Sequence, residues 1–274
     1  MVTVGIVLIH NGDRDRIATA QEAIHGFARA VEGAVTVVVG EESKQPPIVA
    51  APLPQKLLAW YLSVTGDHRW ANYLSPPDSL SERRQRLRAT LKYSRKQLKR
   101  MLRRGKRVSV ARAVSAKNIR AWKKLLSEGW DFLIVVEDDV VLSAESGKEI
   151  EAVADTLVSL NPSDRVFASL AKALSIDDIG ASTLVTKQTD TLTWFSKPVT
   201  NTAGAYMVSR GLAEAFVSQI SRHRLLAQNP ADWILNHLFM RLHRQRRPIT
   251  CFHTREGIFV NRSLLGDLPS HTQV

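Results

Sequence analysis

The feature that most constrains the fold is a short apolar run that leads straight into three acidic residues. Residues 132–136 read FLIVV, and Glu137, Asp138 and Asp139 follow at once. A run that is apolar at every position is typical of a central parallel strand covered on both faces. In open α/β sheets, ligands gather beyond the carboxyl ends of such strands. The run therefore predicts an α/β fold with three carboxylates at a ligand-binding edge, the alternative being an acidic turn that lies in water.

The other segments agree with an α/β sheet. The chain opens with a predicted strand at 4–9, an amphipathic helix at 15–31 and a second strand at 35–39, and this order is typical of parallel sheets. With 274 residues, the chain is long enough for one large domain of this kind. Further helices are predicted at 114–127, 145–160, 211–220 and 231–242, and further strands at 166–170, 191–195, 205–208 and 249–252.

The positive charge is concentrated in one segment. The net charge is +12, yet residues 83–107 hold 13 Lys and Arg and no acid, so the rest of the chain is close to neutral. This segment belongs to a predicted helical insertion at 53–107. Such a helix could be a solvated face, bind the anionic surface of a membrane, or bind nucleic acid. We favour the membrane surface, and nucleic acid is the least favoured partner. The leucines that share one helical face are Leu87, Leu91, Leu98 and Leu102.

Other features bear on the compartment. Cys251 is the single cysteine, so no disulfide can form within the chain, as is common in reducing compartments. No uncharged apolar run approaches the roughly 20 residues that cross a bilayer. The first residues read as a strand and lack the basic leader and cleavage site of a signal peptide. We therefore expect a cytoplasmic protein, either soluble or peripheral on the inner face of the membrane.

The three neighbouring carboxylates predict a cation site. Crowded carboxylates repel one another, which raises their pKa values. A divalent cation removes this penalty, and carboxylate oxygens are ligands that Mg²⁺ and Mn²⁺ prefer. Side chains two residues apart on an extended chain lie on the same side. Glu137 and Asp139 are therefore expected to point one way and Asp138 the other.

Five blocks of the sequence occur in an order that resembles a known family. The block VSAKNIRAWKKLLSEGWDFLIVVEDDVVLS (114–143) reads as a helix with a Trp near its middle and a strand ending in Glu-Asp-Asp. The other blocks are VLIHNGDRDRI (7–17), PSDRVFASL (162–170), TNTAGAYMVSRGLAEAFV (200–217) and NPADWILNHL (229–238). Together they resemble glycosyltransferase family 25, the lipooligosaccharide and collagen-type sugar transferases. The chain differs where Lys117 and Asn118 replace the family's Ser-His, so any role of that histidine is absent.

The resemblance implies a GT-A fold, in which a Rossmann-like, mostly parallel sheet flanked by helices binds a nucleotide sugar. On this basis residues 1–274 form one glycosyltransferase domain, and the basic helical insertion is an addition to the family pattern. The implied reaction is metal-dependent, inverting transfer of a hexose from a nucleotide sugar, with a UDP-sugar favoured, to a cell-surface or lipid-linked glycan acceptor. The cation, Mn²⁺ or Mg²⁺, would stabilise the leaving diphosphate.

The resemblance also assigns roles to single residues. Asp139 is expected to be the direct metal ligand, with Glu137 as a second ligand or a ribose contact and Asp138 near the nucleotide. His253 follows a predicted strand and could complete the metal shell, although a lone histidine there is more often a surface or core residue. Asp232 precedes an apolar helix and is the candidate general base. Its alternative role is a first-turn acid that stabilises the helix by about 1 kcal/mol.

Two further groups are expected at the donor. One follows the first predicted strand, at the same sheet edge as the acids, and its arginines could meet the nucleotide's phosphates. The other lies just before a strand, in the block that the family places near the donor sugar, where a glycine permits close backbone approach. For both groups the alternative is a solvated loop or a simple turn. The expected contacts are His10, Asn11, Arg14, Arg16, Asn201, Thr202 and Gly204.

Two other functions stay open. A nucleic-acid-binding protein with a degenerate transferase body would bind DNA or RNA in a salt-sensitive way and would not turn over nucleotide sugars. A metal-dependent nucleotidyl- or phosphotransferase would use the same acidic strand end. It would release pyrophosphate or a sugar phosphate and no nucleoside diphosphate.

Overall fold

A computed structural model of the protein describes residues 1–42, 52–103, 105–172 and 174–262. The helices are α1 (Arg14–Ala30), α2 (Leu53–Leu74), α3 (Leu80–Arg103), α4 (Gly105–Glu128), α5 (Gly147–Ser159), α6 (Arg210–Arg222) and α7 (Ala231–Arg244), with short 3-10 helices η1 (Ser182–Leu184) and η2 (Arg224–Gln228). The strands are β1 (Val2–Ile9), β2 (Val35–Glu42), β3 (Phe132–Glu137), β4 (Val140–Leu142), β5 (Val166–Ser169), β6 (Ala171–Lys172), β7 (Val185–Gln188), β8 (Leu192–Phe195), β9 (Ala205–Ser209), β10 (Thr250–Thr254) and β11 (Phe259–Asn261).

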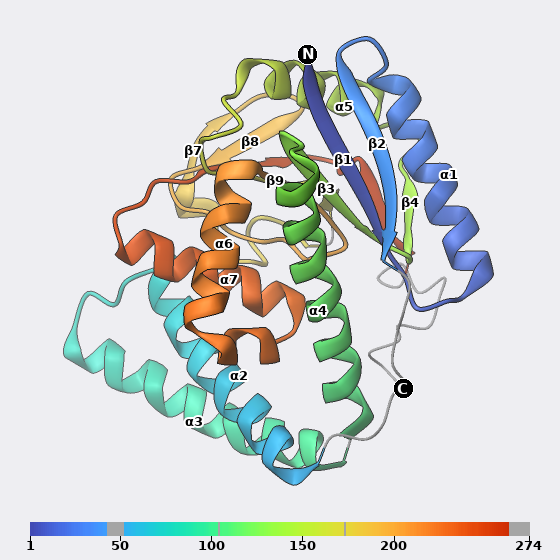
Figure 1. The fold of residues 1–274 in the computed structure, drawn as a ribbon. Coiled ribbons are helices and arrows are strands. Elements are labelled where there is room, and N and C mark those ends of the chain that lie inside the picture. Colours follow the sequence, from blue (N-terminus) through green and yellow to red (C-terminus); the bar gives the residue numbers. More distant parts are fainter. Residues whose placement is uncertain (43–51, 104, 173, 263–274) are drawn as a thin grey trace.

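The centre of the fold is an eight-stranded sheet in the order β2-β1-β3-β9-β5-β10-β8-β7, with helices on both faces (Figure 1). Strands β9 and β8 run opposite to the others, which share one direction. The sheet is therefore mixed but mostly parallel. This confirms the predicted α/β class with a mostly parallel sheet flanked by helices.

Strand β3 lies inside the sheet, between β1 and β9. Leu133 and Val135 pack into the core covered by α4, α6 and α7, while Phe132, Ile134 and Val136 pack into the core covered by α1 and α5. All five side chains are fully buried. Burial on both faces explains why this strand is apolar at every position, and it confirms the prediction made from FLIVV.

Helix α1 starts where its sequence supplies a cap. The Asp13 side chain accepts hydrogen bonds from the backbone N–H groups of Asp15 and Arg16, each at 3.2 Å. These bonds satisfy donors that the first turn of a helix leaves without partners. The opposite end of the helix buries Phe27 against the sheet. The loop between β1 and α1 is thereby held at the carboxyl edge of the sheet.

The predicted helical insertion at 53–107 contains α2, α3 and the first turn of α4. Helix α2 packs against α3, α4 and α7, and α3 packs against α4. The sequence predicted that the following helix begins at residue 114, whereas α4 begins at Gly105. Val110 accounts for one turn of this difference, because it is buried and extends the apolar face upstream from Val114.

Three short strands form a second sheet in the order β4-β11-β6, next to α1. The sequence did not predict it, because strands of two or three residues carry too little periodicity. Strand β2 also runs on through Gly40 to Glu42, beyond its predicted end at residue 39. No helix in the described ranges is both long and apolar enough to cross a membrane.

Candidate functional site

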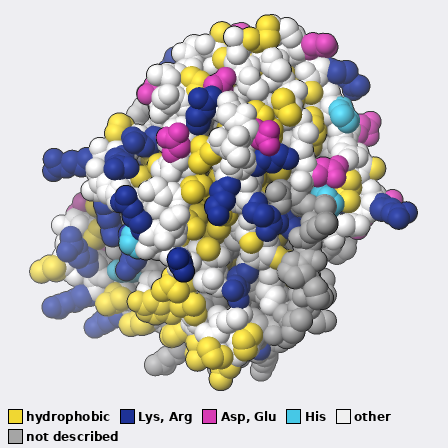
Figure 2. All heavy atoms as spheres, viewed as in Figure 1, with side chains coloured by type: hydrophobic (Ala, Val, Ile, Leu, Met, Phe, Trp, Pro, Cys, Tyr) yellow, Lys and Arg dark blue, Asp and Glu magenta, His cyan; other side chains and the backbone are white. Residues whose placement is uncertain are grey.

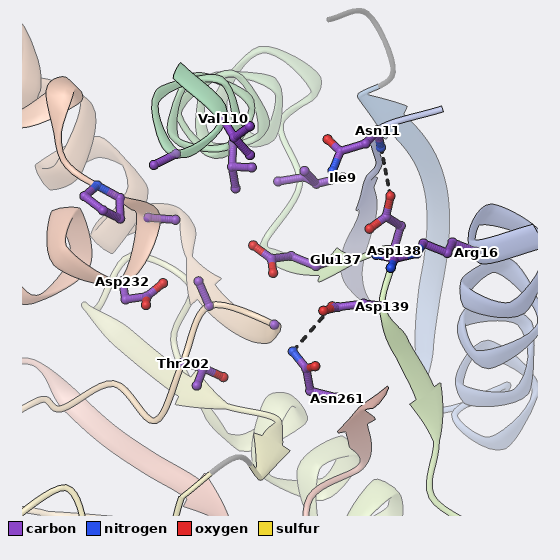
Figure 3. A pocket seen from close by; sticks show the side chains of 16 residues that line it. Ile9, Asn11, Arg16, Val110, Glu137, Asp138, Asp139, Thr202, Asp232 and Asn261 are labelled. Atoms are coloured by element: carbon purple, nitrogen blue, oxygen red, sulfur yellow. Dashed lines mark hydrogen bonds between the residues drawn. The ribbon is translucent and has the colours of Figure 1, made fainter. Parts of the chain in front are cut away.

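A pocket of about 270 Å³ opens where β1 and β3 end (Figure 3). Its walls come from these strand ends, from α4, from the segment before β9, from the first turn of α7 and from β11. These parts are far apart in the sequence, and the fold brings them together. The lining residues are Ile9, Asn11, Arg16, Val110, Ala111, Val114, Glu137, Asp138, Asp139, Thr202, Ala203, Gly204, Pro230, Ala231, Asp232 and Asn261.

Glu137 and Asp139 are held in place through their backbones. The Glu137 N–H donates to the Gly204 carbonyl at 2.8 Å, and the Asp139 carbonyl accepts from the Arg262 N–H at 2.8 Å. The Asn261 amide nitrogen lies 3.4 Å from Asp139 Oδ1. Both carboxylates line the pocket (Figure 3), so the structure brings together the two acids that the spacing placed on one side.

Asp138 has a structural role, because its side chain positions the loop after β1. Its Oδ2 accepts a hydrogen bond from the Asn11 N–H at 2.8 Å, and its side chain is buried. Lys117 of α4 reaches the same loop and donates to the His10 carbonyl and, at 3.3 Å, to Asn11 Oδ1. Lys117 is only 1% exposed. Asp138 thus ties the acidic turn after β3 to this loop, and Lys117 ties α4 to the same loop.

The acids of the pocket alter the titration of Glu137. Burial raises the pKa of Glu137 well above its ordinary value, and the negative charges of three neighbouring aspartates, Asp139 first among them, raise it further. The positive charge of Lys117 acts in the opposite direction. An ionised Glu137 therefore carries an energetic cost that a bound cation would remove. The electrostatics of the pocket suit a positively charged ligand.

Asp232 enters the pocket from the first turn of α7 and faces Glu137 across it (Figure 3). The protein packed around the pocket raises the pKa of Asp232 by removing part of its hydration, although the side chain remains exposed to the opening. Asp232 is therefore a first-turn acid, where the helix dipole favours it. It is also a carboxylate that can accept a proton from a group in the pocket.

The segment before β9 supplies a strained wall. Thr202 has a φ of 149°, a backbone conformation that residues other than glycine rarely adopt. The residue lines the pocket, and its hydroxyl is buried without a hydrogen-bond partner among the residues that the structure describes. A Cβ on Gly204 would come within 3.2 Å of the Asn261 amide nitrogen. An unpaired hydroxyl beside closely approaching backbone suits a polar ligand.

His253 lies in the core, away from the pocket lining. It sits on β10, where its Nε2 is 2.9 Å from the Val199 carbonyl oxygen and its ring centroid is 4.5 Å from that of Phe195. Burial lowers the pKa of His253 to about 4. The structure does not bring this histidine to the acidic cluster, and its surroundings are those of the core residue named as the alternative.

The predicted donor residues divide between the pocket and its surroundings. Arg16 is buried and lines the pocket, with its Nε 3.7 Å from Asp13 Oδ2. Arg14 is exposed at the start of α1. His10 is buried behind the lining, and its Nδ1 accepts from the Gly12 N–H at 3.2 Å. Asn201 does not line the pocket as the structure describes it. Its side-chain nitrogen donates to the Leu174 carbonyl at 2.8 Å, and its side-chain oxygen accepts from the Leu174 N–H at 2.9 Å.

The donor set fits a cation that shares its ligands with a substrate. Within the described ranges, no three His, Cys, Asp or Glu side chains are grouped so that they could hold a metal ion by themselves. Two carboxylates, Glu137 and Asp139, do share the pocket. Mg²⁺ usually takes one or two carboxylates, several waters and the phosphate oxygens of a substrate. The pocket therefore fits Mg²⁺ or Mn²⁺ bound together with a phosphate ligand, and it does not fit a closed structural metal site.

Sequence reasoning missed Lys117 and Asn261 as parts of the site. Lys117 carried a signal, because it stands between Val114 and Ala121 on a helical face that is otherwise apolar, where a cation needs a specific partner. Asn261 carried none. It reaches the pocket through β11, a strand too short to be predicted.

A buried polar network supports the site from the core. Trp122 Nε1 donates to the Tyr206 hydroxyl at 3.0 Å, and this hydroxyl is bonded to Asn118 Oδ1. Burial raises the pKa of Tyr206, and the nearby charge of Glu137 adds to the effect. Trp122 is thus a core residue, and Asn118 has a structural role here.

Comparisons with known proteins add little to this geometry. No protein-family model and no curated protein matches the sequence. Among solved structures, a glycosyltransferase involved in the glycosylation of the major capsid of PBCV-1 is similar with a TM-score of 0.38 and 6% identity, over 94% of this chain and 91% of that one. A likeness at this TM-score carries no argument. Membership of glycosyltransferase family 25 therefore stays a prediction, and what the geometry itself defines is a mixed α/β protein with an acidic pocket at its strand ends.

Proposed function

We propose that the protein is a glycosyltransferase that moves a hexose from a nucleotide sugar, with a UDP-sugar favoured, to a glycan or lipid-linked saccharide. The observation that carries the proposal is the convergence of Glu137, Asp139 and Asp232 in one pocket at the carboxyl ends of two parallel strands. Ligands of open α/β sheets bind at this edge. The sequence blocks described above supply the choice of reaction.

Glu137 and Asp139 would hold Mn²⁺ or Mg²⁺ against the donor's diphosphate. When bound, the cation supplies positive charge for the leaving diphosphate. The chain positions both carboxylates in advance, because backbone hydrogen bonds to Gly204 and Arg262 fix the two residues that carry them. Neutralising the charge on Glu137 also favours binding, because burial and the adjacent aspartates make that charge costly.

Asp232 would be the general base. In an inverting transfer, the acceptor oxygen bonds to the anomeric carbon while the bond from that carbon to the diphosphate breaks. The hydroxyl proton passes to Asp232, whose raised pKa makes it a better proton acceptor than an ordinary aspartate. Its place across the pocket from Glu137 leaves the space between them for the donor sugar and the acceptor (Figure 3).

The remaining lining residues would bind the donor. Arg16, beside the acidic turn, is suited to a phosphate oxygen. The backbone around Gly204 and the hydroxyl of Thr202 are suited to the sugar, because they offer close approach and a free polar group. Asn11, which Lys117 and Asp138 hold in place, borders the same space.

A donor screen tests the proposal. Purified protein is incubated with Mn²⁺ and each common nucleotide sugar, and nucleoside diphosphate release is measured. We expect release from one sugar class, dependence on divalent cation, and its loss in Asp139→Ala. Release of pyrophosphate or of a sugar phosphate would instead indicate nucleotidyl- or phosphotransfer. Asp139→Ala with wild-type turnover would overturn the assignment of the pocket.

A further inference from the structure

We propose that the α2–α3 hairpin, residues 53–103, binds the surface of an anionic phospholipid bilayer. The inference rests on the proposed function in one respect, since it places the acceptor of that reaction at a membrane. The sequence pointed to the cations and leucines of one helix. The structure adds a second helix and a shared apolar face.

Both helices expose large apolar side chains, each at least 42% exposed. On α2 they recur every four residues, and on α3 they are seven and four residues apart, so each set lies on one helical face. Isolated exposed apolar residues are common, but aligned rows on two packed helices mark an interaction surface. The exposed side chains are Leu53, Leu57 and Tyr61 on α2 and Leu80, Leu87 and Leu91 on α3.

The two rows border the seam between the helices. A groove of about 470 Å³ lies there, lined on α3 by Leu80 and Leu87 and on α2 by His68 and Asn72. His68 follows Tyr61 by seven residues and so shares its face of α2. Figure 2 shows apolar side chains gathered over the lower part of the molecule, where α2 lies, with Lys and Arg beside them.

Cations flank the apolar rows. Arg83, Arg84, Arg88 and Lys92 are exposed on α3, and two of these arginines line the groove. The whole stretch 83–107 has 13 basic residues and no acid. A surface that combines aligned apolar side chains with cations of one sign matches the interface of an anionic bilayer, where the apolar groups enter the acyl boundary and the cations meet the headgroups.

The apolar rows favour a bilayer over nucleic acid. Phosphate backbones are bound by cations and polar groups, and exposed leucines contribute nothing to such contacts. The uniform positive charge also disfavours a second copy of the chain, because two such faces would repel each other. An anionic bilayer satisfies both features of the surface.

The hairpin leads directly to the proposed active pocket. Helix α3 ends at Arg103 and α4 begins at Gly105, while Val110 and Val114 of α4 line the pocket. A bilayer bound along the hairpin would therefore be linked to the pocket wall through α4. This arrangement suits an acceptor saccharide carried on a lipid.

Vesicle flotation of the full chain tests the inference. Vesicles of phosphatidylcholine alone are compared with vesicles that also contain phosphatidylglycerol, at low and at physiological ionic strength. We expect at least about tenfold stronger binding to the anionic vesicles, weakened by salt. Equal binding to both vesicle types, or no binding at low salt, would overturn the proposal.

Two variants separate the apolar and the charged contributions. Leu87→Ser with Leu91→Ser should weaken binding at least about tenfold, and because both side chains are exposed, circular dichroism should be unchanged. Val158→Ser, at a side chain that is 56% exposed on α5, is the matched control and should bind as wild type. If the double leucine variant binds anionic vesicles as tightly as wild type, the apolar rows have no role and the proposal fails.

The charge variant carries Arg83→Gln, Arg84→Gln, Arg88→Gln and Lys92→Gln. We expect its affinity for anionic vesicles to fall about fivefold per cation removed. Duplex DNA binding is measured in parallel. If the protein binds DNA equally well with and without the two leucine substitutions and binds no vesicles, the surface is a nucleic-acid surface instead. Asp139→Ala should bind vesicles as wild type, so a failure of the catalytic proposal leaves this one testable. The control with the same net charge is Arg29→Gln, Lys148→Gln, Lys187→Gln and Arg222→Gln, all exposed elsewhere.

Discussion

The pocket and the α2–α3 hairpin concentrate charge in opposite ways. In the pocket, segments distant in sequence bring acids into a partly enclosed space, where burial and then the neighbouring negative charges raise the pKa of Glu137. On the hairpin, exposed cations stand along helix α3. Charges gathered by the fold act on a small ligand at short range, whereas charges spread along a helix act on an extended surface and are screened by salt. Activity at the pocket should therefore depend on single residues, whereas membrane binding by the hairpin should depend on the number of cations.

The largest effect is expected from a substitution that abolishes the pocket's activity and leaves the hairpin unchanged. Asp139→Ala removes the proposed cation ligand, and we expect nucleoside diphosphate release to fall by about 10²–10³-fold or more. Vesicle binding should not change. Asp190→Ala, at an exposed acid in the β7–β8 turn, should keep wild-type turnover. Loss of vesicle binding together with turnover would show that the two regions are not independent.

Asp232 allows a sharper test, because a second first-turn acid provides the comparison. Asp232→Asn should lower transfer by about 10²–10⁴-fold while donor binding, measured by calorimetry, is retained. Asp15→Asn changes the exposed first-turn acid of α1 and should cost about 0.3–1 kcal/mol of stability with no loss of transfer. If Asp232→Asn behaves like Asp15→Asn, Asp232 only stabilises its helix.

Features that depend on neighbouring residues in the chain could be predicted from the sequence, whereas features that depend on contacts between distant segments could not. The β3 strand and its acids were predictable, because continuous burial leaves a continuous apolar run and a topological rule places its end at a site. Asp232 was named as a candidate base through the resemblance of its block, not through this rule. By contrast, His253 and Asn201 lie on or before neighbouring strands, yet their side chains are bound to backbone groups away from the pocket. The direction of a side chain depends on packing that a sequence pattern does not contain.

The hairpin also has one feature that the sequence predicts and one that depends on tertiary packing. Its cations were evident, because charge is a property of composition and needs no fold. The exposure of Leu57 and Tyr61 was not, because an aromatic and apolar helix such as α2 is normally read as core. Only its packing between α3 and α7 leaves one face uncovered. The side chain of Leu102, which the leucine row included, lies outside the described side chains.

Acidification should destabilise the folded core through its buried histidines. The pKa of His253 is lowered from 6.5 to about 4 by burial, so the unfolded chain takes up a proton before the folded one does. Stability is therefore lost as the pH falls from about 6.5 towards 4, by up to about 3 kcal/mol from this residue.

Chemical denaturation at a series of pH values measures this loss. His253→Gln should make the free energy of unfolding less dependent on pH in that interval, although His237, whose pKa burial also lowers to about 4, keeps part of the slope. A wild-type slope in His253→Gln would mean that the side chain is already solvated in the folded protein.

The smallest expected effect concerns Thr202, where stability and donor binding should respond in opposite directions. Thr202→Gly relieves a backbone conformation that costs about 1–3 kcal/mol, so the free energy of unfolding should stay equal or rise. The same change removes the hydroxyl of this lining residue, which is proposed to contact the donor, and the donor KM should rise about fivefold to tenfold, as expected for one lost hydrogen bond. Thr186→Gly, in the exposed strand β7, should instead lower stability by about 0.5–1 kcal/mol and leave KM unchanged. Equal destabilisation by both substitutions would show that Thr202 is not strained, whereas an unchanged KM would remove its hydroxyl from the donor site.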